Sequence, residues 1–234
     1  MDRTTLQRLI EVFEMVNAQN NGDQALVAVL AHILAMRNRV VAFDEGRFAD
    51  VVSKARLLCL IRGLLAKSCE GDTLALSVAL LFELVAKGSG HGLIVSSHPA
   101  NQSGASSNEV SDVDVFAVDG ETLFHCAEAK DKPFTRADVD HAAGKVATAG
   151  HVALVFVHGP NARADADLPA LTAEYEAKRF DLTFVGAMAF AMGIVLLAPG
   201  VTWAEAVELV NRHLAMTRAK EVTIEHCRAV LGAA

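Results

Sequence analysis

Four charged residues stand at the ends of two expected strands. Asp112 and Asp114 open the first strand, and Glu128 and Lys130 close the second. A charge in a buried strand is costly unless it is paired or binds a metal. Strand residues two apart share a face, and carboxylate oxygens suit Mg²⁺. A lysine there could orient a metal-bound water or stabilise charge on an attacked phosphate. The alternative is solubility charges on an edge strand, with an exposed acid and lysine pair.

The register of this hairpin decides whether the acids can meet. Asp119-Gly120 is a strong signal for a two-residue turn, which would place Asp114 opposite His125. Paired residues share a face, so Glu128 would then point to the other side of the sheet. We therefore predict a wider turn, over residues 120–122, or a bulge that shifts the register.

The elements that must position these residues follow from hydrophobic periodicity. Apolar spacing of three and four predicts helices in LQRLIEVFEMV, in ALVAVLAHILAM and over 48–67. A fourth helix, LALSVALLFELVAK, is expected to be capped by Asp72 or Thr73 and to stop at Gly88. Further helices are predicted over 136–149 and 168–178 and after Thr202, which forms a capping box with Glu205. Strands are predicted over 92–96, 112–118, 122–130, 151–159 and 181–185.

This order predicts an α/β fold, with a mixed central sheet flanked by helices and a helical N-terminal layer. We expect residues 1–70 to form a helical region packed on a core of residues 71–234, in one compact domain. The uncharged run 182–203 contains glycines and a proline, so strand and short buried helix are favoured over a membrane span.

Composition limits the classes of function. Of 234 residues, 52% are hydrophobic, which supports a sizeable core. The net charge of -7 argues against a protein that coats nucleic acid everywhere, but not against a local basic surface. The four cysteines lack CxxC spacing, which favours buried cytosolic thiols, and the charged N-terminus is no signal peptide. A cytoplasmic protein without a membrane partner is expected.

Val113-Asp114 followed by Glu128-Ala129-Lys130 resembles the motif of the PD-(D/E)XK nucleases. Asp114 is preferred to Asp112 because apolar residues follow it, as they usually do in that superfamily. The resemblance implies that Asp114 and Glu128 hold the metal and that Lys130 positions the attacking water. Many members add an acid on the preceding helix, and Glu83 in LLFELV stands at that place. An isolated motif of this kind also occurs by chance.

A closer resemblance is to type II restriction endonucleases of the SacI type. It rests on ALVAVLA, on DVDVFAVDGETLFHCAEAK, and on the helix and apolar strand that follow. It implies a Mg²⁺-dependent, site-specific endonuclease on double-stranded DNA, acting as a homodimer, with a cognate DNA methyltransferase as a further partner. Val stands where many superfamily members have Pro, and known members of this type extend further at the N-terminus. The alternatives are a repair or recombination nuclease of the same fold and an inactive DNA-binding or assembly module.

Further polar residues could contact DNA. Lys132, Arg136 and Lys145 follow the motif and could bind phosphates, although a solvated helix face explains them equally well. Polar side chains in the segment SHPANQSGASSNEVS could read base edges, although an ordinary surface loop is slightly favoured. The candidates there are Asn101, Gln102 and Asn108.

Overall fold

The computed structural model describes residues 50, 52–99 and 109–233. The two helices predicted in the first 40 residues, and most of the polar loop, lie outside these residues. The predicted division of the chain at residue 70 therefore stays a prediction. Asp50–Ala234 make up one compact unit, and the fold described here is that of this unit.

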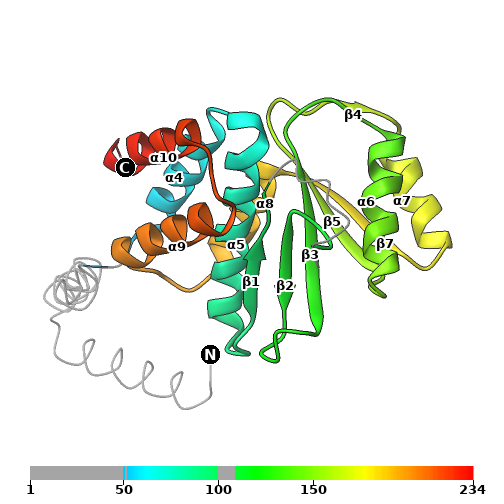
Figure 1. The fold of residues 1–234 in the computed structure, drawn as a ribbon, viewed down its shortest axis with the longest axis horizontal. Coiled ribbons are helices and arrows are strands. Elements are labelled where there is room, and N and C mark those ends of the chain that lie inside the picture. Colours follow the sequence, from blue (N-terminus) through cyan, green and yellow to red (C-terminus); the bar gives the residue numbers. More distant parts are fainter. Residues whose placement is uncertain (1–49, 51, 100–108, 234) are drawn as a thin grey trace, which may run out of the picture. The chain divides into compact units, whose positions relative to one another are not determined.

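A five-stranded mixed sheet forms the centre of the unit (Figure 1). Its order is β1-β2-β3-β5-β7, antiparallel from β1 to β3 and parallel from β3 to β7. The strands are β1 (Ile94–Ser97), β2 (Val113–Phe116), β3 (Leu123–Lys130), β5 (Ala153–His158) and β7 (Asp181–Gly186). A short parallel pair, β4 (Phe134–Thr135) and β6 (Ala164–Asp165), lies beside it. The predicted α/β class with a mixed sheet is confirmed.

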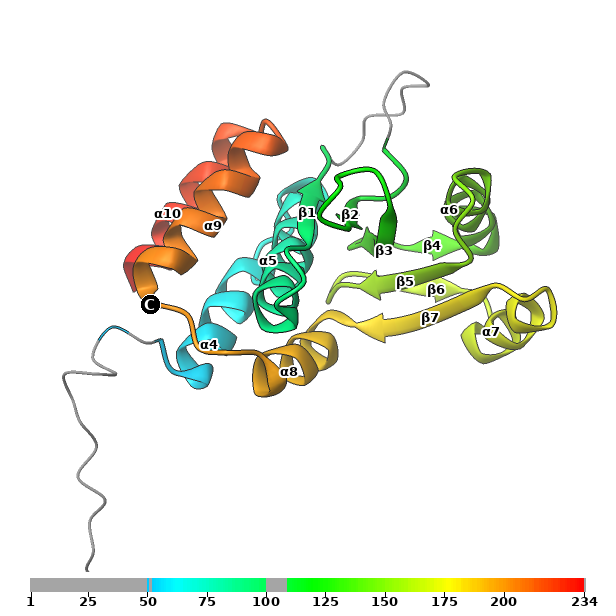
Figure 2. The same ribbon diagram turned by 90° about the horizontal axis from the view of Figure 1, so that it is seen from below.

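Helices cover both faces of the sheet (Figure 2). One side carries α4 (Lys54–Leu65), the 3-10 turn η1 (Cys69–Gly71), α5 (Asp72–Ser89), α8 (Ala187–Leu197), α9 (Trp203–Met216) and α10 (Glu221–Ala233). The other side carries α6 (Arg136–Thr148) and α7 (Leu168–Ala177). Two hydrophobic clusters follow this division, because alternate residues of each strand point to opposite faces. The layered arrangement leaves the strand ends as the places where charged side chains can meet.

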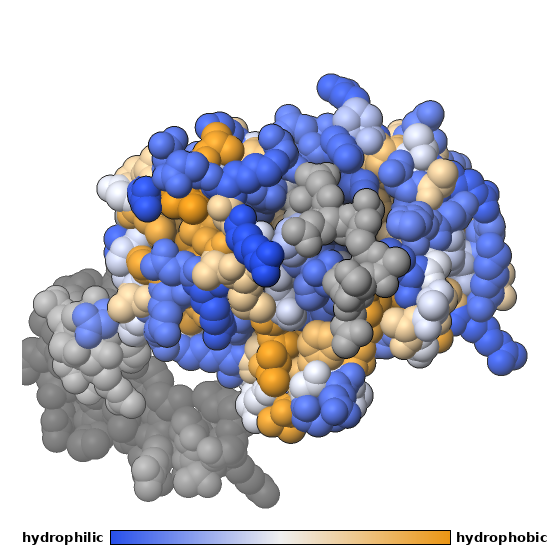
Figure 3. Space-filling model, viewed as in Figure 1, coloured by the Kyte–Doolittle hydropathy of each residue, from blue (hydrophilic) through white to orange (hydrophobic). Residues whose placement is uncertain are grey.

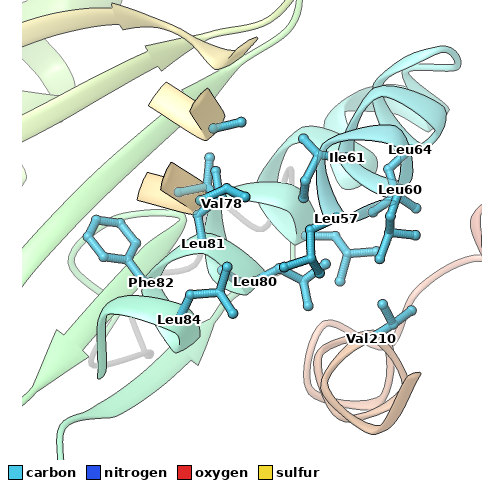
Figure 4. Close-up of a cluster of buried hydrophobic side chains, with 14 of the residues drawn as sticks. Leu57, Leu60, Ile61, Leu64, Val78, Leu80, Leu81, Phe82, Leu84 and Val210 are labelled. Carbon is cyan, nitrogen blue, oxygen red and sulfur yellow. The ribbon is translucent and has the colours of Figure 1, made fainter. Parts of the chain in front are cut away.

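Helix α5 lies at the centre of the larger cluster. It is apolar on nearly all sides, which fits a helix surrounded by other elements. Figure 4 shows Leu80 of α5 beside Leu57 of α4, in a cluster that also contains Leu84 of α5 and Val210 of α9. On the other face, the rings of Phe134 and Phe156 lie 4.9 Å apart between centroids. The two cores pack α5 and α6 against opposite faces of the strands between them.

The start of α5 differs from the prediction. Gly71, with φ of +101°, is the N-cap, and Asp72 is already inside the helix. The Thr73 hydroxyl donates to the carbonyls of Lys67 and Ser68, and Asp72 accepts from Thr223 of α10. Both candidate caps are therefore used to tie α5 to neighbouring segments, and glycine supplies the left-handed turn.

The C-terminal predictions are largely confirmed. Thr202 and Glu205 form the capping box of α9, with hydrogen bonds of 2.6 and 3.1 Å. The uncharged run contains the end of β7 and the 11-residue α8. Within the described ranges, no helix is both long enough and apolar enough to cross a membrane.

The surface on the face shown in Figure 3 is mainly hydrophilic, with apolar patches at a few places. Exposed apolar side chains of the described residues include three on α8, namely Met192, Leu196 and Leu197. The described residues therefore bury only part of the apolar side chains of α8.

Candidate active site

A bulge in the β2–β3 hairpin decides which residues face each other. Near the turn, Phe116 is opposite Leu123, which is the register of a two-residue loop at Asp119-Gly120. Deeper in the sheet, Val115 is opposite His125, so one extra residue of β3 has been inserted. Beyond the bulge, each residue of β2 therefore pairs with a β3 residue one position further along than in a two-residue hairpin, and the faces of the paired residues are exchanged. The predicted bulge is confirmed, and with it the placing of the acids of both strands on one face.

The shifted register puts Asp112 directly opposite Glu128. Val113 is opposite Ala127, and continuing this pairing by one residue places Asp112 beside Glu128. Directly paired residues share a face and have closely spaced side chains. Lys130, two residues beyond Glu128, points to the same face. The bulge thus brings two carboxylates and a lysine together at the end of the hairpin.

These side chains line an open pocket of about 820 Å³. Its walls come from η1, the segments that flank the β1 and β2 ends, the end of β3, helix α6, and the turn between α9 and α10. The charged residues that line it are Glu70, Glu109, Asp112, Glu128, Lys130, Asp131, Lys132, Lys145 and Lys220, with His98 and His141 beside them.

Asp112 and Glu128 each have one carboxylate oxygen without a protein partner among the described residues. Lys130 Nζ lies 3.3 Å from Glu128 Oε1, and the Ala129 amide donates to Asp112 Oδ2 at 2.8 Å. Asp112 Oδ1 and Glu128 Oε2 are left over. The Glu128 and Lys130 side chains are only 12% and 19% exposed. The free oxygens therefore lie in a sheltered site, where water solvates them poorly.

The charge balance of this site favours a cation. Burial and the neighbouring Glu128 raise the pKa of Asp112 to about 7, against the opposing effects of the Ala129 amide, Lys130 and Lys145. No group of three or more His, Cys, Asp and Glu in the described ranges is placed to hold a metal ion. Mg²⁺ commonly uses only one or two carboxylates and retains several waters. The pair of Asp112 and Glu128 fits that requirement and would lose its mutual repulsion on binding.

Asp114 is placed differently from the prediction. It is fully buried, and its Oδ1 accepts from the Ser111 amide and hydroxyl. Its Oδ2 accepts from the Val110 amide and lies 3.0 Å from His98 Nε2. Both oxygens are saturated, so none is available to a metal. The structure does not bring Asp114 to the pocket, and Asp112 takes the place expected for it.

Glu83 is also remote from the pocket. Its carboxylate pairs with Arg212 and lies 3.0 Å from Nε2 of the buried His213, whose Nδ1 lies 2.9 Å from Ser97 Oγ. This chain of contacts joins α5, α9 and β1. Glu83 thus contacts Arg212 and His213 of α9, and it is not among the described residues that line the pocket.

The predicted DNA contacts divide in the same way. Lys132 and Lys145 line the pocket, and neither forms an ion pair with another described residue. Arg136 pairs instead with Asp140 and Glu174, away from the pocket. Asn101, Gln102 and Asn108 lie outside the described residues.

Some pocket residues belong to no sequence motif. Glu70 and Lys220 are 150 residues apart and form an ion pair at its edge. His98 follows β1 directly, and its backbone amide donates to the Asp112 carbonyl at 2.9 Å. None of these three positions could be predicted from local sequence, because only the tertiary fold brings the segments together. The sequence places His98 at the start of a polar loop, which gives no hint of its contact with Asp114.

Gly159 lies close to Asp131, which lines the pocket, and this close approach leads to a prediction about stability. Asp131 accepts from Asn161 at 2.9 Å, and an added Cβ at Gly159 would lie 2.2 Å from Asp131 Oδ1. We expect Gly159→Ala to lower the free energy of unfolding by about 1–3 kcal/mol. Gly144→Ala in α6 is the control: its Cβ meets nothing within 4 Å, so it should be neutral or stabilising. Equal midpoints of the two variants in urea unfolding would contradict this account.

One protein family matches the part of the chain that contains Asp112, Glu128 and Lys130. Residues 49–160 match the family described as the SacI restriction endonuclease C-terminal domain. The matched segment includes Asp112, Glu128 and Lys130, so this part of the chain is similar to SacI-type restriction endonucleases, which supports a relationship to the PD-(D/E)XK nucleases. The mixed sheet flanked by helices is consistent with a restriction-endonuclease-like fold. No curated protein matches the chain at a significant level.

Proposed function

We propose that this protein is a Mg²⁺-dependent endonuclease that hydrolyses phosphodiester bonds of double-stranded DNA, as a type II restriction enzyme. The observation that supports it most is the meeting of Asp112, Glu128 and Lys130 in one pocket, within the segment related to restriction endonucleases. The match to a restriction endonuclease domain supports nuclease activity on DNA. That the enzyme requires Mg²⁺ and cuts at a specific DNA sequence is proposed in addition.

Each residue has a role that its surroundings support. Asp112 and Glu128 would hold the metal ion through their free oxygens. When bound, such an ion supplies positive charge to a phosphate and lowers the pKa of a water. Lys130, held 3.3 Å from Glu128, is placed to orient the attacking water and to stabilise negative charge on the phosphate. Lys132 and Lys145 are proposed to bind neighbouring phosphates of the backbone.

Site specificity leads to two further proposals about partners. A palindromic target mirrors a two-fold symmetric protein, so we propose that the enzyme acts as a homodimer. A cytoplasmic restriction enzyme must not cut its host DNA, so we propose a cognate DNA methyltransferase as its companion.

Incubation with phage DNA tests the function. We expect discrete fragments with Mg²⁺ and none with EDTA. A smear or structure-specific nicks would instead favour a repair or recombination nuclease. Intact DNA under all metal conditions, with a folded protein, would contradict a nuclease and leave the inactive binding or assembly module.

Binding of Mg²⁺ should depend on pH because of Asp112. Its raised pKa, about 7, means that a proton competes with the metal below neutral pH. We expect calorimetric titration of the wild-type protein to give about tenfold weaker Mg²⁺ binding at pH 6 than at pH 8. The same affinity at both pH values would contradict metal binding by an Asp112 whose pKa is near 7.

A further inference from the structure

The pocket has a second wall that the family match does not reach. Residues 49–160 include η1, β1, β2, β3 and α6, whereas Lys220 lies in the turn between α9 and α10. Figures 1 and 2 place this turn on one side of β2 and β3 and α6 on the other. Lys132 and Lys145 line the pocket from the α6 side. Lysines therefore stand on both sides of the acidic centre.

Lys220 is held in this position by contacts on both sides of it in the chain. Thr223 donates to Asp72 at 2.9 Å, and the Cys69 thiol donates to the Val222 carbonyl, so the start of α10 is tied to η1 and α5. Glu70 forms an ion pair with Lys220 from a left-handed backbone conformation, φ of +63°. Few residues other than glycine adopt this conformation. It directs the Glu70 side chain to the pocket edge.

The pair of Glu70 and Lys220 is exchangeable. The two side chains are 63% and 54% exposed, and exposed ion pairs contribute little to stability. A DNA phosphate can therefore replace the carboxylate at small cost. By contrast, the other acids of the pocket have other contacts or roles. Asp131 accepts from Asn161, Glu109 lies 3.6 Å from His98 between Oε1 and Nδ1, and Asp112 and Glu128 face the proposed metal.

A protein of net charge -7 must bind DNA through such local cations. We propose that Lys220 binds a phosphate of the DNA backbone from the wall opposite Lys132 and Lys145, and that Glu70 holds Lys220 until the phosphate displaces it. The C-terminal helices α9 and α10 are thereby part of the DNA-binding surface. This inference rests on the proposed function and adds a partner contact to it.

Fluorescence anisotropy with a labelled mixed-sequence duplex of about 30 base pairs tests this. The full chain is titrated in EDTA between 50 and 200 mM salt, so that binding is measured without cleavage. We expect Lys220→Ala to weaken binding about three- to tenfold at 50 mM salt and to reduce the salt slope by about one. Glu70→Gln should tighten binding about two- to fivefold, and should have no effect once Lys220 is alanine.

Arg228→Ala is the matched control. Arg228 is exposed, lies on α10, pairs with Glu221 and does not line the pocket. Its replacement by alanine removes one positive charge, as Lys220→Ala does. A salt-dependent wild type with equal affinities of Lys220→Ala and Arg228→Ala would overturn this inference alone. An independent effect of Glu70→Gln in the Lys220→Ala protein would overturn the displacement by phosphate. A wild type that neither binds nor cuts DNA would instead refute the proposed function.

Discussion

Asp112→Asn is expected to slow DNA cleavage by two to three orders of magnitude, about 10²–10³-fold, while the protein remains folded. The change removes one of the two carboxylates proposed to hold the metal but keeps the size of the side chain and its oxygen for the Ala129 amide. Loss of a preorganised charged group of this kind costs about 10²–10³-fold in rate. Rates of plasmid cleavage under saturating Mg²⁺ measure the effect, and circular dichroism establishes that the variant is folded.

The same variant has an expected effect on stability that separates charge from structure. The pKa of Asp112 is raised in the folded protein, so its contribution favours folding at low pH and is lost as pH rises through about 7. Without metal, Asp112→Asn should therefore be more stable than wild type at pH 8, by on the order of 1–2 kcal/mol. At pH 5 the difference should shrink. A variant that cuts DNA at the wild-type rate would contradict the role of Asp112.

Asp114→Asn is expected to destabilise the protein strongly. The buried carboxylate accepts from two backbone amides and the Ser111 hydroxyl, and an asparagine would turn an NH₂ group toward one set of these donors. Breaking a buried charged network typically costs about 3–5 kcal/mol. Urea unfolding, followed by far-UV circular dichroism, measures the loss.

Asp119→Asn provides the control in the same hairpin. Asp119 accepts from the Glu121 and Thr122 amides at the turn, but it is exposed. Its replacement should cost only about 1 kcal/mol. If Asp114→Asn were as stable as Asp119→Asn but had lost metal-dependent cleavage, the roles of Asp112 and Asp114 would have to be exchanged.

Hydrophobic periodicity was enough to predict the mixed sheet and most element boundaries. Parity also predicted that a two-residue hairpin is incompatible with acids on one face, and the bulge beside Phe116 agrees with this. However, the requirement that the acids share a face does not determine which residue of β2 pairs with which residue of β3. Asp112 and Asp114 both lie on the correct face, and only the actual pairing shows that Asp112 is opposite Glu128. The apolar residues that follow Asp114 are typical of the motif but do not determine the register.

Long-range contacts account for the other differences. Glu83 lies on the predicted helix, but its neighbours Arg212 and His213 come from α9, about 130 residues later. Lys220 reaches the pocket because Thr223 and Asp72 join α10 to α5. Local patterns cannot show such pairs, because they depend on how the helices pack on the sheet.

The position of the metal tests the central claim most directly. A crystal soaked in Mn²⁺, which suits the same carboxylate ligands as Mg²⁺, would give an anomalous signal for the ion. We predict a single peak in the pocket, about 2.2 Å from carboxylate oxygens of both Asp112 and Glu128. A peak bound by Asp114 instead, or no peak between Asp112 and Glu128 in a well-occupied soak, would contradict the account.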